Sequence, residues 1–347
     1  MATAVKTLKT QTREKYSDPR LIRKLTILLV ASAALILIAV VSLRFGSMRF
    51  STGQILDALF SAEDSTVRVI VTDSRLPRML LATMVGANLA VAGALLQAVM
   101  RNPLADPGLT GVSTGAALVA VTIMLVFPAH TSLVPFGAFI GGAIACFMVF
   151  SLAWKRGVDP IRIILAGVAV NAILGGGTSL ISLLNSDRIQ GVLMWLNGSI
   201  ANKSWFHVHM LAPYAIVGLI VALLCIKAAN MLQLGDDVAK NLGLKVNLAR
   251  LVLSAVAAYL AGISVAAVGL IGFVGLIIPH VSRLLIGSDY KFMLPLSAVL
   301  GAMLLIAADT TARTAFSPIQ LPVGIIMAIL GGPFFLYLLR RGGAYKV

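Results

Sequence analysis

The sequence is poor in charged residues, and in acidic ones most of all. Only 12% of its 347 residues are charged, and 13 acidic side chains stand against 28 lysines and arginines. An average soluble domain has about 25% charged residues, and no soluble fold could cover the apolar surface of a chain that is 59% hydrophobic. The net charge of +15 would suggest nucleic acid in a soluble protein, but nothing else here indicates nucleic-acid binding. A soluble protein is therefore excluded.

The chain also lacks a nucleotide-binding loop and has few acidic residues inside its apolar runs. No Gly-x-x-x-x-Gly-Lys-Ser/Thr loop is present, and no glycine is followed by lysine, so the sequence predicts no phosphate-binding loop for ATP. Any ATP and Mg²⁺ must then be bound by a separate subunit, with no cofactor in this chain. The acidic residues lie in loops or at the ends of apolar runs, Asp106 and Asp309 being nearest to the interior. This placement disfavours a proton-coupled carrier.

No catalytic or metal-binding set is visible. The four histidines are scattered, and the closest two, His207 and His209, are two residues apart and would not face one metal on a helix. Cys146 and Cys225 lie in apolar runs, where an unpaired cysteine acts as a small buried hydrophobe. The sequence predicts no metal site and a non-catalytic protein.

What the chain has in abundance is long apolar runs. A membrane-spanning helix needs about 20 mainly apolar residues, and polar breaks divide this chain into about ten such runs. We therefore predict an all-α polytopic membrane protein, in which the first run is a retained helix because no cleavage signal follows it. The predicted spans are 25–43, 79–99, 109–127, 133–154, 161–184, 206–227, 248–270, 271–286, 292–308 and 321–339.

The basic residues predict the orientation of these spans. Placing the N-terminus inside puts most of the 28 lysines and arginines on the cytoplasmic side, as the positive-inside rule requires. The sequence then divides into a basic cytoplasmic segment 1–24, a transmembrane domain 25–340 and a cytoplasmic tail 341–347. Both termini are predicted to be cytoplasmic.

The run from Arg75 to Ala116 joins a helix rich in small residues to a segment rich in proline and glycine. Small residues let helix backbones approach closely. This favours packing within one subunit over a subunit interface or a substrate path, although packing and a path are compatible. Prolines and glycines follow where a helix should end and restart, so irregular backbone should enter the membrane here, buried in protein or beside water. The candidate packing or path residues are Gly86, Gly93, Asn102, Pro103, Pro107, Gly111 and Gly115.

The polar segment 229–245 is the longest predicted cytoplasmic loop. Its helix-forming residues, ended by Gly243, favour a short cytoplasmic helix. An ordinary solvated loop is the alternative.

Several stretches resemble one family in the same order along the chain. Nearly the whole sequence after residue 70 is similar to the FecCD/BtuC-like permease family, which serves iron-siderophore, haem and cobalamin ABC importers. The stretches are Arg75 to Ala116, WLNGS (195–199), QLGDDVAKNLGL (233–244), GLIGFVGLIIPHVSRLLIGSDY (269–290), AADTTAR (307–313), and LPVGI with GGPFF (321–335).

The resemblance implies an assembly in a bacterial plasma membrane. Two permeases, identical or different, would lie side by side above two cytoplasmic ATPase subunits, and an extracytoplasmic binding protein would deliver a ferric-siderophore ligand. Membrane lipid would surround this assembly, and no nucleic acid would take part.

The resemblance also implies roles for two sets of residues. It places ATPase coupling in the 229–245 segment, at Gly235, Asp236, Ala239, Leu242, Gly243 and Leu244. It implies that Arg75, Arg78 and Arg313 dock carboxylates of the binding protein, which guanidinium groups pair with bidentately; anchoring at lipid head groups is the alternative. The family often has Glu where this chain has Gln320.

Other functions remain as alternatives. Cobalamin or haem import is possible within the family, because all these chelates are bulky and no selectivity motif is visible. A secondary carrier would need an embedded ionisable coupling residue, and a purely structural scaffold would not need the broken segment around 103–111. We rank the iron-chelate permease first.

Overall fold

The computed structural model describes residues 19–46, 48, 50–60, 65–155, 157–317 and 319–341. Over these ranges the chain is helical, with one isolated bridge between Trp154 and Val158 and no strand. Residues 1–18 and 342–347, most of the two predicted terminal segments, lie outside them. The all-α prediction is confirmed.

Each of the ten predicted spans is a helix. Seven helical stretches in the described part of the chain are long and apolar enough to cross a membrane, and three shorter apolar helices accompany them. The ten helices are α2 (Pro19–Arg44), α5 (Leu76–Met100), α6 (Val112–Val126), α7 (Val134–Ala153), α8 (Pro160–Leu184), α10 (Trp205–Leu224), α13 (Val246–Val268), α14 (Val274–Ile286), α15 (Tyr290–Thr314) and α16 (Val323–Arg341).

Two predicted boundaries are wrong. The helix α2 begins at Pro19, so the last residues of the predicted polar segment 1–24 are already helical. The helix α15 continues to Thr314, six residues past the predicted end at 308. In both cases polar side chains interrupt the apolar run while the backbone remains helical, because hydropathy reports the surroundings of side chains and not backbone hydrogen bonding.

Short helices join the long ones, and most were too short to predict. The helix α3 (Thr52–Phe60) buries Ile55 and Ala58 against the end of α2. Next, α4 (Thr66–Val69) and a π-helical turn η1 (Ile70–Arg75) run directly into α5, giving a continuous helical stretch of 35 residues. The others are η2 (Pro107–Thr110), η3 (Pro128–Leu133), η4 (Ser186–Arg188), α9 (Ile189–Leu196), α11 (Ile226–Gln233) and α12 (Asp236–Asn241).

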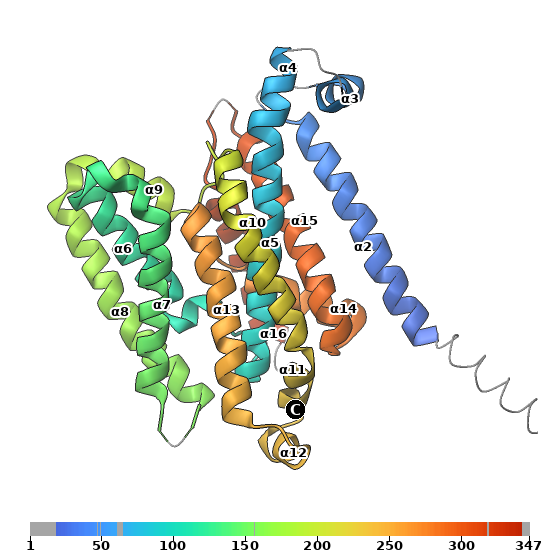
Figure 1. The fold of residues 1–347 in the computed structure, drawn as a ribbon, viewed down its shortest axis with the longest axis vertical. Helices are drawn as coiled ribbons and strands as arrows, with labels where there is room; N and C mark the ends of the chain where they lie inside the picture. The colour runs from blue at the N-terminus through green and yellow to red at the C-terminus, as the bar shows by residue number, and fades with distance from the viewer. Residues whose placement is uncertain are drawn as a thin grey trace, which may run out of the picture.

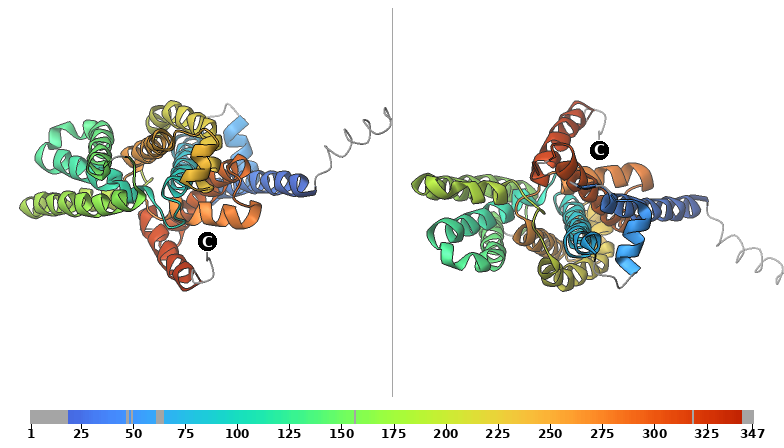
Figure 2. Two further views of the ribbon diagram at one scale, coloured as in Figure 1. Left: turned by 90° about the horizontal axis from the view of Figure 1, so that it is seen from below. Right: turned by 90° about the horizontal axis from the view of Figure 1, so that it is seen from above.

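The helix α5 is the centre of the molecule. It contacts α10, α13, α14 and α15, and we call these five helices the core group. Beside the core group, α6, α7 and α8 pack on one another as a side lobe, and α13 contacts α7 and α6 where the two groups meet (Figure 1). By contrast α8 and α16 project from the outside of the molecule (Figure 2). The order of burial thus runs from α5 outward.

The two ends of the molecule differ. Figure 1 places α12 at the end where α2 begins, and α3, α4 and α9 at the opposite end. We call these the α12 end and the α3 end. The predicted coupling segment and the predicted docking arginines therefore lie at opposite ends of the bundle.

Glycines let α5 pack this tightly. A Cβ on Gly86 would overlap the backbone of Gly301 in α15, and one on Gly93 would overlap the backbone of Gly275 in α14. In the side lobe, Gly115 of α6 meets the backbone of Gly141 in the same way. Backbones in contact gain dispersion energy that larger side chains would prevent. These three predicted residues thus bring helix backbones together within the subunit.

We predict that Gly93→Ala destabilises the protein by about 1–3 kcal/mol, since the added methyl group forces α5 and α14 apart. Gly176→Ala is the matched control, because a Cβ on Gly176 of α8 meets nothing within 4 Å. There alanine should stabilise the helix slightly. Thermal unfolding in detergent micelles measures both, and equal midpoints for the two variants would contradict this account.

Candidate functional site

The segment between α5 and α6 turns the chain back into the bundle. Arg101 closes α5 with left-handed backbone (φ 47°), and the Asn102 carboxamide oxygen accepts a hydrogen bond from the Leu104 amide at 2.8 Å. The Asp106 carboxylate accepts one from the Gly108 amide at 2.8 Å and caps η2. Gly111, with φ 81°, then turns the chain into α6, a conformation that favours glycine. The predicted irregular backbone is confirmed.

This segment is held from the side by α8. The Asn171 carboxamide donates to the Gly108 carbonyl at 3.1 Å and accepts from the Thr114 hydroxyl at 2.6 Å. A cavity of about 250 Å³ borders it, lined by Asp106 and by Ser113 of α6, and on the other side by residues of α5, α13 and the turn before α14. Of the predicted path residues, Pro107 is buried beside this cavity, whereas Pro103 is exposed.

The α3 end holds a buried ion pair that joins α5 to α15. The Arg78 guanidinium donates to both carboxylate oxygens of Asp309 at 2.8–3.1 Å, and to the Gln320 carboxamide oxygen at 2.8 Å. The side chains of Arg78 and Asp309 are only 9% and 4% exposed. The Asp309 carboxylate therefore sits inside the bundle with its charge balanced.

Two further arginines fasten the loop after α2 to the same place. Arg75 donates to the Leu43 carbonyl at 2.6 Å and to that of Met48, and it stacks over the Phe50 ring at 4.5 Å. Arg313 donates to the Ser42 carbonyl. The end of α2, the loop after it and the adjoining ends of α5 and α15 thus converge on guanidinium groups.

The expected exposure of Arg75, Arg78 and Arg313 is wrong. Their residues are 5%, 8% and 7% exposed, because carbonyl and carboxylate oxygens of the chain itself surround the guanidinium groups. The docking role stays a prediction, and it now requires these side chains to leave their present acceptors. Where the family often has Glu, the Gln320 carboxamide oxygen accepts a hydrogen bond from Arg78 at 2.8 Å.

The predicted short helix at the other end is present as α12. Gly235, with φ 96°, begins it, and Gly243, with φ 84°, ends it. Ala239 is fully buried and fastens the helix to the bundle, while Leu242 is 57% exposed and Leu244 is half-buried. Three apolar side chains of this short segment, Leu234, Val238 and Leu242, are 47–57% exposed. A group of exposed apolar side chains is typical of a surface that contacts another protein.

Asp236 ties α12 to two long helices. Its carboxylate lies 2.9 Å from the Arg250 guanidinium of α13 and 3.4 Å from that of Arg101, the residue that caps α5. Arg250 is 6% exposed at its side chain and also donates to the Val158 carbonyl at 2.8 Å. Sequence reasoning missed both arginines, since 135 and 14 residues separate the partners.

The turn from α14 to α15 borders this cluster. The Asp289 carboxylate accepts hydrogen bonds from the Asn230 carboxamide at 2.9 Å and the Lys291 amide at 3.0 Å. Burial raises the pKa of Asp289, but these hydrogen bonds and the charges of Lys24 and Lys291 together outweigh burial and lower it. Asp289 is thus an ionised anchor between α11 and α15.

Polar side chains continue along α5 between the two ends. Gln97 donates to the Gly275 carbonyl at 3.3 Å and accepts from Arg283 at 3.1 Å, and the Tyr290 hydroxyl donates to the Ala94 carbonyl at 2.7 Å. Among the described residues, no three His, Cys, Asp or Glu side chains are grouped to hold a metal.

We predict that Asp309→Ala destabilises the protein by about 3–5 kcal/mol, because it leaves the Arg78 charge buried and unpaired. Replacing both partners, as Arg78→Met with Asp309→Leu, should recover much of that loss. Asp237→Ala is the control, since the Asp237 side chain is 98% exposed and should matter little. A thermal midpoint for Asp309→Ala equal to that of Asp237→Ala would contradict the role of the ion pair.

Comparison with known proteins agrees with these features. The sequence model described as the FecCD transport family matches residues 34–341. The chain is 42% identical to the Fe(3+)-citrate import system permease protein YfmD of Bacillus subtilis over 88% of this chain and 91% of that protein. It is 43% identical to the cobalamin import system permease protein BtuC of Halobacterium salinarum, over 79% of this chain and 74% of that protein.

A solved structure has the same fold. An inward-facing structure of a metal-chelate type ABC transporter superposes with a TM-score of 0.81 and 29% sequence identity, covering 91% of this chain and 99% of that one. A family match over most of the length, relatives above 40% identity and a shared fold all agree: the chain belongs to the FecCD transport family.

Proposed function

We propose that this chain is the membrane permease subunit of an ATP-driven importer of ferric chelates of the siderophore type. Permeases of this family are transport components that work with a permease partner and ATPase subunits. The observation that carries the proposal is α12, a short surface helix whose Asp236 is ion-paired to the cap of the buried central helix α5. A push on α12 from outside the bundle would be transmitted directly to α5.

The substrate class is supported by the names of the relatives and by the type of the superposed transporter. Relatives are named for iron-citrate, hydroxamate, cobalamin and haemin import, and the superposed transporter is of the metal-chelate type. Ferric chelates of the siderophore type are favoured because more than one of the similar permeases handles them. Cobalamin or haem remains the second candidate.

A second permease copy or paralogue has an apolar face to pack on. The helix α8 is mostly unburied, with Ile173, Leu183 and Leu184 at least 70% exposed, and α16 exposes Ile329 and Leu336. Both helices lie on the outside of the molecule (Figure 2). Next to these side chains, Gly176 and Gly332 would allow close approach of another helix, since a Cβ on either meets nothing within 4 Å.

The orientation of the chain in the membrane follows from the positions of α12 and α3 at opposite ends of the bundle. We assign the α12 end to the cytoplasm, where ATPase subunits lie, and the α3 end to the outside, where a binding protein would arrive. The beginning of α2 and the end of α16 then both lie on the cytoplasmic side of a bacterial plasma membrane. ATP and Mg²⁺ belong to the partner ATPase in this scheme.

A secondary carrier is the rival from another class. It would need an ionisable residue free to exchange a proton within the membrane. Asp309 does lie within a helix, but its charge is held by Arg78 at 2.8 Å. The geometry therefore favours ATP as the energy source.

We predict that uptake needs ATP and no proton gradient. Proteoliposomes that contain this chain, its partner permease, the ATPase and the binding protein should accumulate a ferric chelate with ATP inside, and a protonophore should leave the rate unchanged. Collapse of uptake with the protonophore, while ATP hydrolysis continues, would favour the secondary carrier. Growth of a deletion strain on single iron chelates would then identify the substrate.

We predict that Asp236→Lys uncouples ATP hydrolysis from transport. The new charge repels Arg101 and Arg250, so α12 loses its link to α5 and α13, and uptake per ATP should fall about fivefold or more, as for a coupling free energy of 1–3 kcal/mol. Hydrolysis and membrane insertion should persist.

Asp237→Lys is a matched control for this experiment. It makes the same charge change one residue away, on a side chain that is 98% exposed and 4.0 Å from Lys240 alone. Equal uptake per ATP in the two variants would remove Asp236 from the coupling route.

A further inference from the structure

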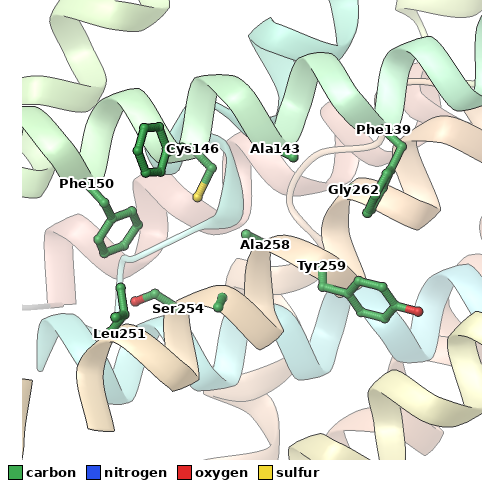
Figure 3. Close-up of a pocket in the computed structure, with 11 residues that line it drawn as sticks. Phe139, Ala143, Cys146, Phe150, Leu251, Ser254, Ala258, Tyr259 and Gly262 are labelled. Carbon is green, nitrogen blue, oxygen red and sulfur yellow. The ribbon is translucent and has the colours of Figure 1, made fainter. Parts of the chain in front are cut away.

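A narrow slot runs along the junction of the side lobe and the core group, between α7 and α13 (Figure 3). Its volume is about 280 Å³, and its walls are apolar except for Cys146, Ser254 and Tyr259. The small residues Ala258 and Gly262 of α13 leave the space open. The helices α7 and α13 contact one another beside the slot, and the slot remains open between them.

The slot has the length of a lipid chain. Its lining extends from Phe139 to Phe150 on α7 and from Gly262 back to Leu251 on α13, which at 1.5 Å per residue is about 17 Å. The hydrocarbon core of a bilayer is about 30 Å thick, so the slot matches the depth of one leaflet. Both α7 and α13 belong to helices that can cross a membrane.

The mouth of the slot opens toward the membrane. Phe147 at its rim is 72% exposed and Leu251 is 40% exposed. In both end-on views α7 and α13 lie on the opposite side of the molecule from α16 (Figure 2). The slot therefore lies away from α16, one of the two helices that the proposed partner permease would cover, and its exposed rim faces lipid when the chain spans a membrane.

One end of the slot offers polar groups. The Ser254 hydroxyl lines the slot one helical turn from Leu251, is buried, and has no hydrogen-bond partner. A buried hydroxyl without a partner costs free energy, and an acceptor in the slot would satisfy it. At the same end, the exposed side chains of Lys155, just after α7, and Lys245, just before α13, present positive charge.

We propose that the slot binds one acyl chain of a membrane phospholipid from the leaflet at the α12 end. The first part of the chain, about 12 Å at 1.5 Å per residue, lies along α7 and α13 between Ser254 and Gly262. Its ester carbonyl accepts a hydrogen bond from the Ser254 hydroxyl, and its phosphate lies near Lys155 and Lys245. The order of apolar wall, lone hydroxyl and lysines along the slot is the order of chain, ester and phosphate in a phospholipid. The bound chain fills the junction between side lobe and core group.

The test is native mass spectrometry of the full chain released from nanodiscs of a diester phospholipid, at activation energies that strip loosely held lipid. Wild type should retain phospholipid. Ala258→Phe places a ring in the slot and should lose it. Val252→Phe adds the same ring to the same helix at a residue that is 41% exposed and does not line the slot, and should retain lipid like wild type.

Ala143→Phe fills the slot from the exposed side of α7. It provides a second test in case Ala258→Phe does not fold. Loss of lipid in either filled variant, with retention in Val252→Phe, supports the proposal. Retention in both filled variants, or none in wild type, overturns it.

Ser254 is tested separately with a diether phospholipid, which lacks the carbonyl. Wild type should retain the diester lipid better than the diether lipid, and Ser254→Ala should abolish that preference. Equal retention of both lipids by wild type would overturn the placement of the ester at Ser254.

Discussion

The structure depends on placing one helix, α5, in the middle of the bundle. A helix surrounded by protein at membrane depth loses the contact with lipid that its neighbours keep, so it must gain as much from packing. Hydrophobic burial offers little here, because lipid is as apolar as leucine, and close backbone contact has to replace it. The contacts of Gly86 with Gly301 and of Gly93 with Gly275 provide this. The sequence of α5 accordingly places two glycines and six alanines among its leucines and methionines.

The same position makes α5 the element that both ends of the molecule share. At the α3 end, Arg78 pairs with Asp309, and at the α12 end, Arg101 contacts Asp236. The first pair is buried and is screened little by salt, whereas the second is about half exposed at Arg101 and is weaker. The Arg78–Asp309 contact at the α3 end is thus hard to break. The Arg101–Asp236 contact at the α12 end can be exchanged at a lower cost in free energy.

Much of this fold could be predicted from the sequence, because hydropathy and helix-breaking residues are local signals. The ten spans and the break around Pro103 to Gly111 were located in this way. Arg78 and Arg313 lie at the same end of the bundle, at the start of α5 and the end of α15, but their burial was not predictable. Arg78 meets a carboxylate 231 residues away, and a pairing across that separation has no local signature. The apolar run ends at residue 308, so hydropathy predicts the end of a span at Asp309. The helix α15 nevertheless continues to Thr314.

The α12 cluster shows the same limit. The segment predicts a short helix, since Gly235 and Gly243 bound a helix-forming stretch, yet nothing in it predicts that Asp236 reaches the cap of α5. The resemblance to a family adds roles to residues but not their partners. For the arginines it implied a surface, and the structure places them in the interior.

The continuous helical stretch from Thr66 to Met100 has a mechanical consequence. Its 35 residues span about 52 Å at 1.5 Å per residue, well beyond the roughly 30 Å of a hydrocarbon core. The Arg78–Asp309 pair fastens this rod about one third of the way along it. The contacts of Gly86 with Gly301 and of Gly93 with Gly275 tie the longer arm to α15 and α14, so the rod tilts together with these helices. A slight tilt about that pivot moves the Arg101 end farther than the α3 end. Small displacements at the α3 end would therefore be enlarged where α5 meets α12, and large displacements of α12 would reach the α3 end reduced.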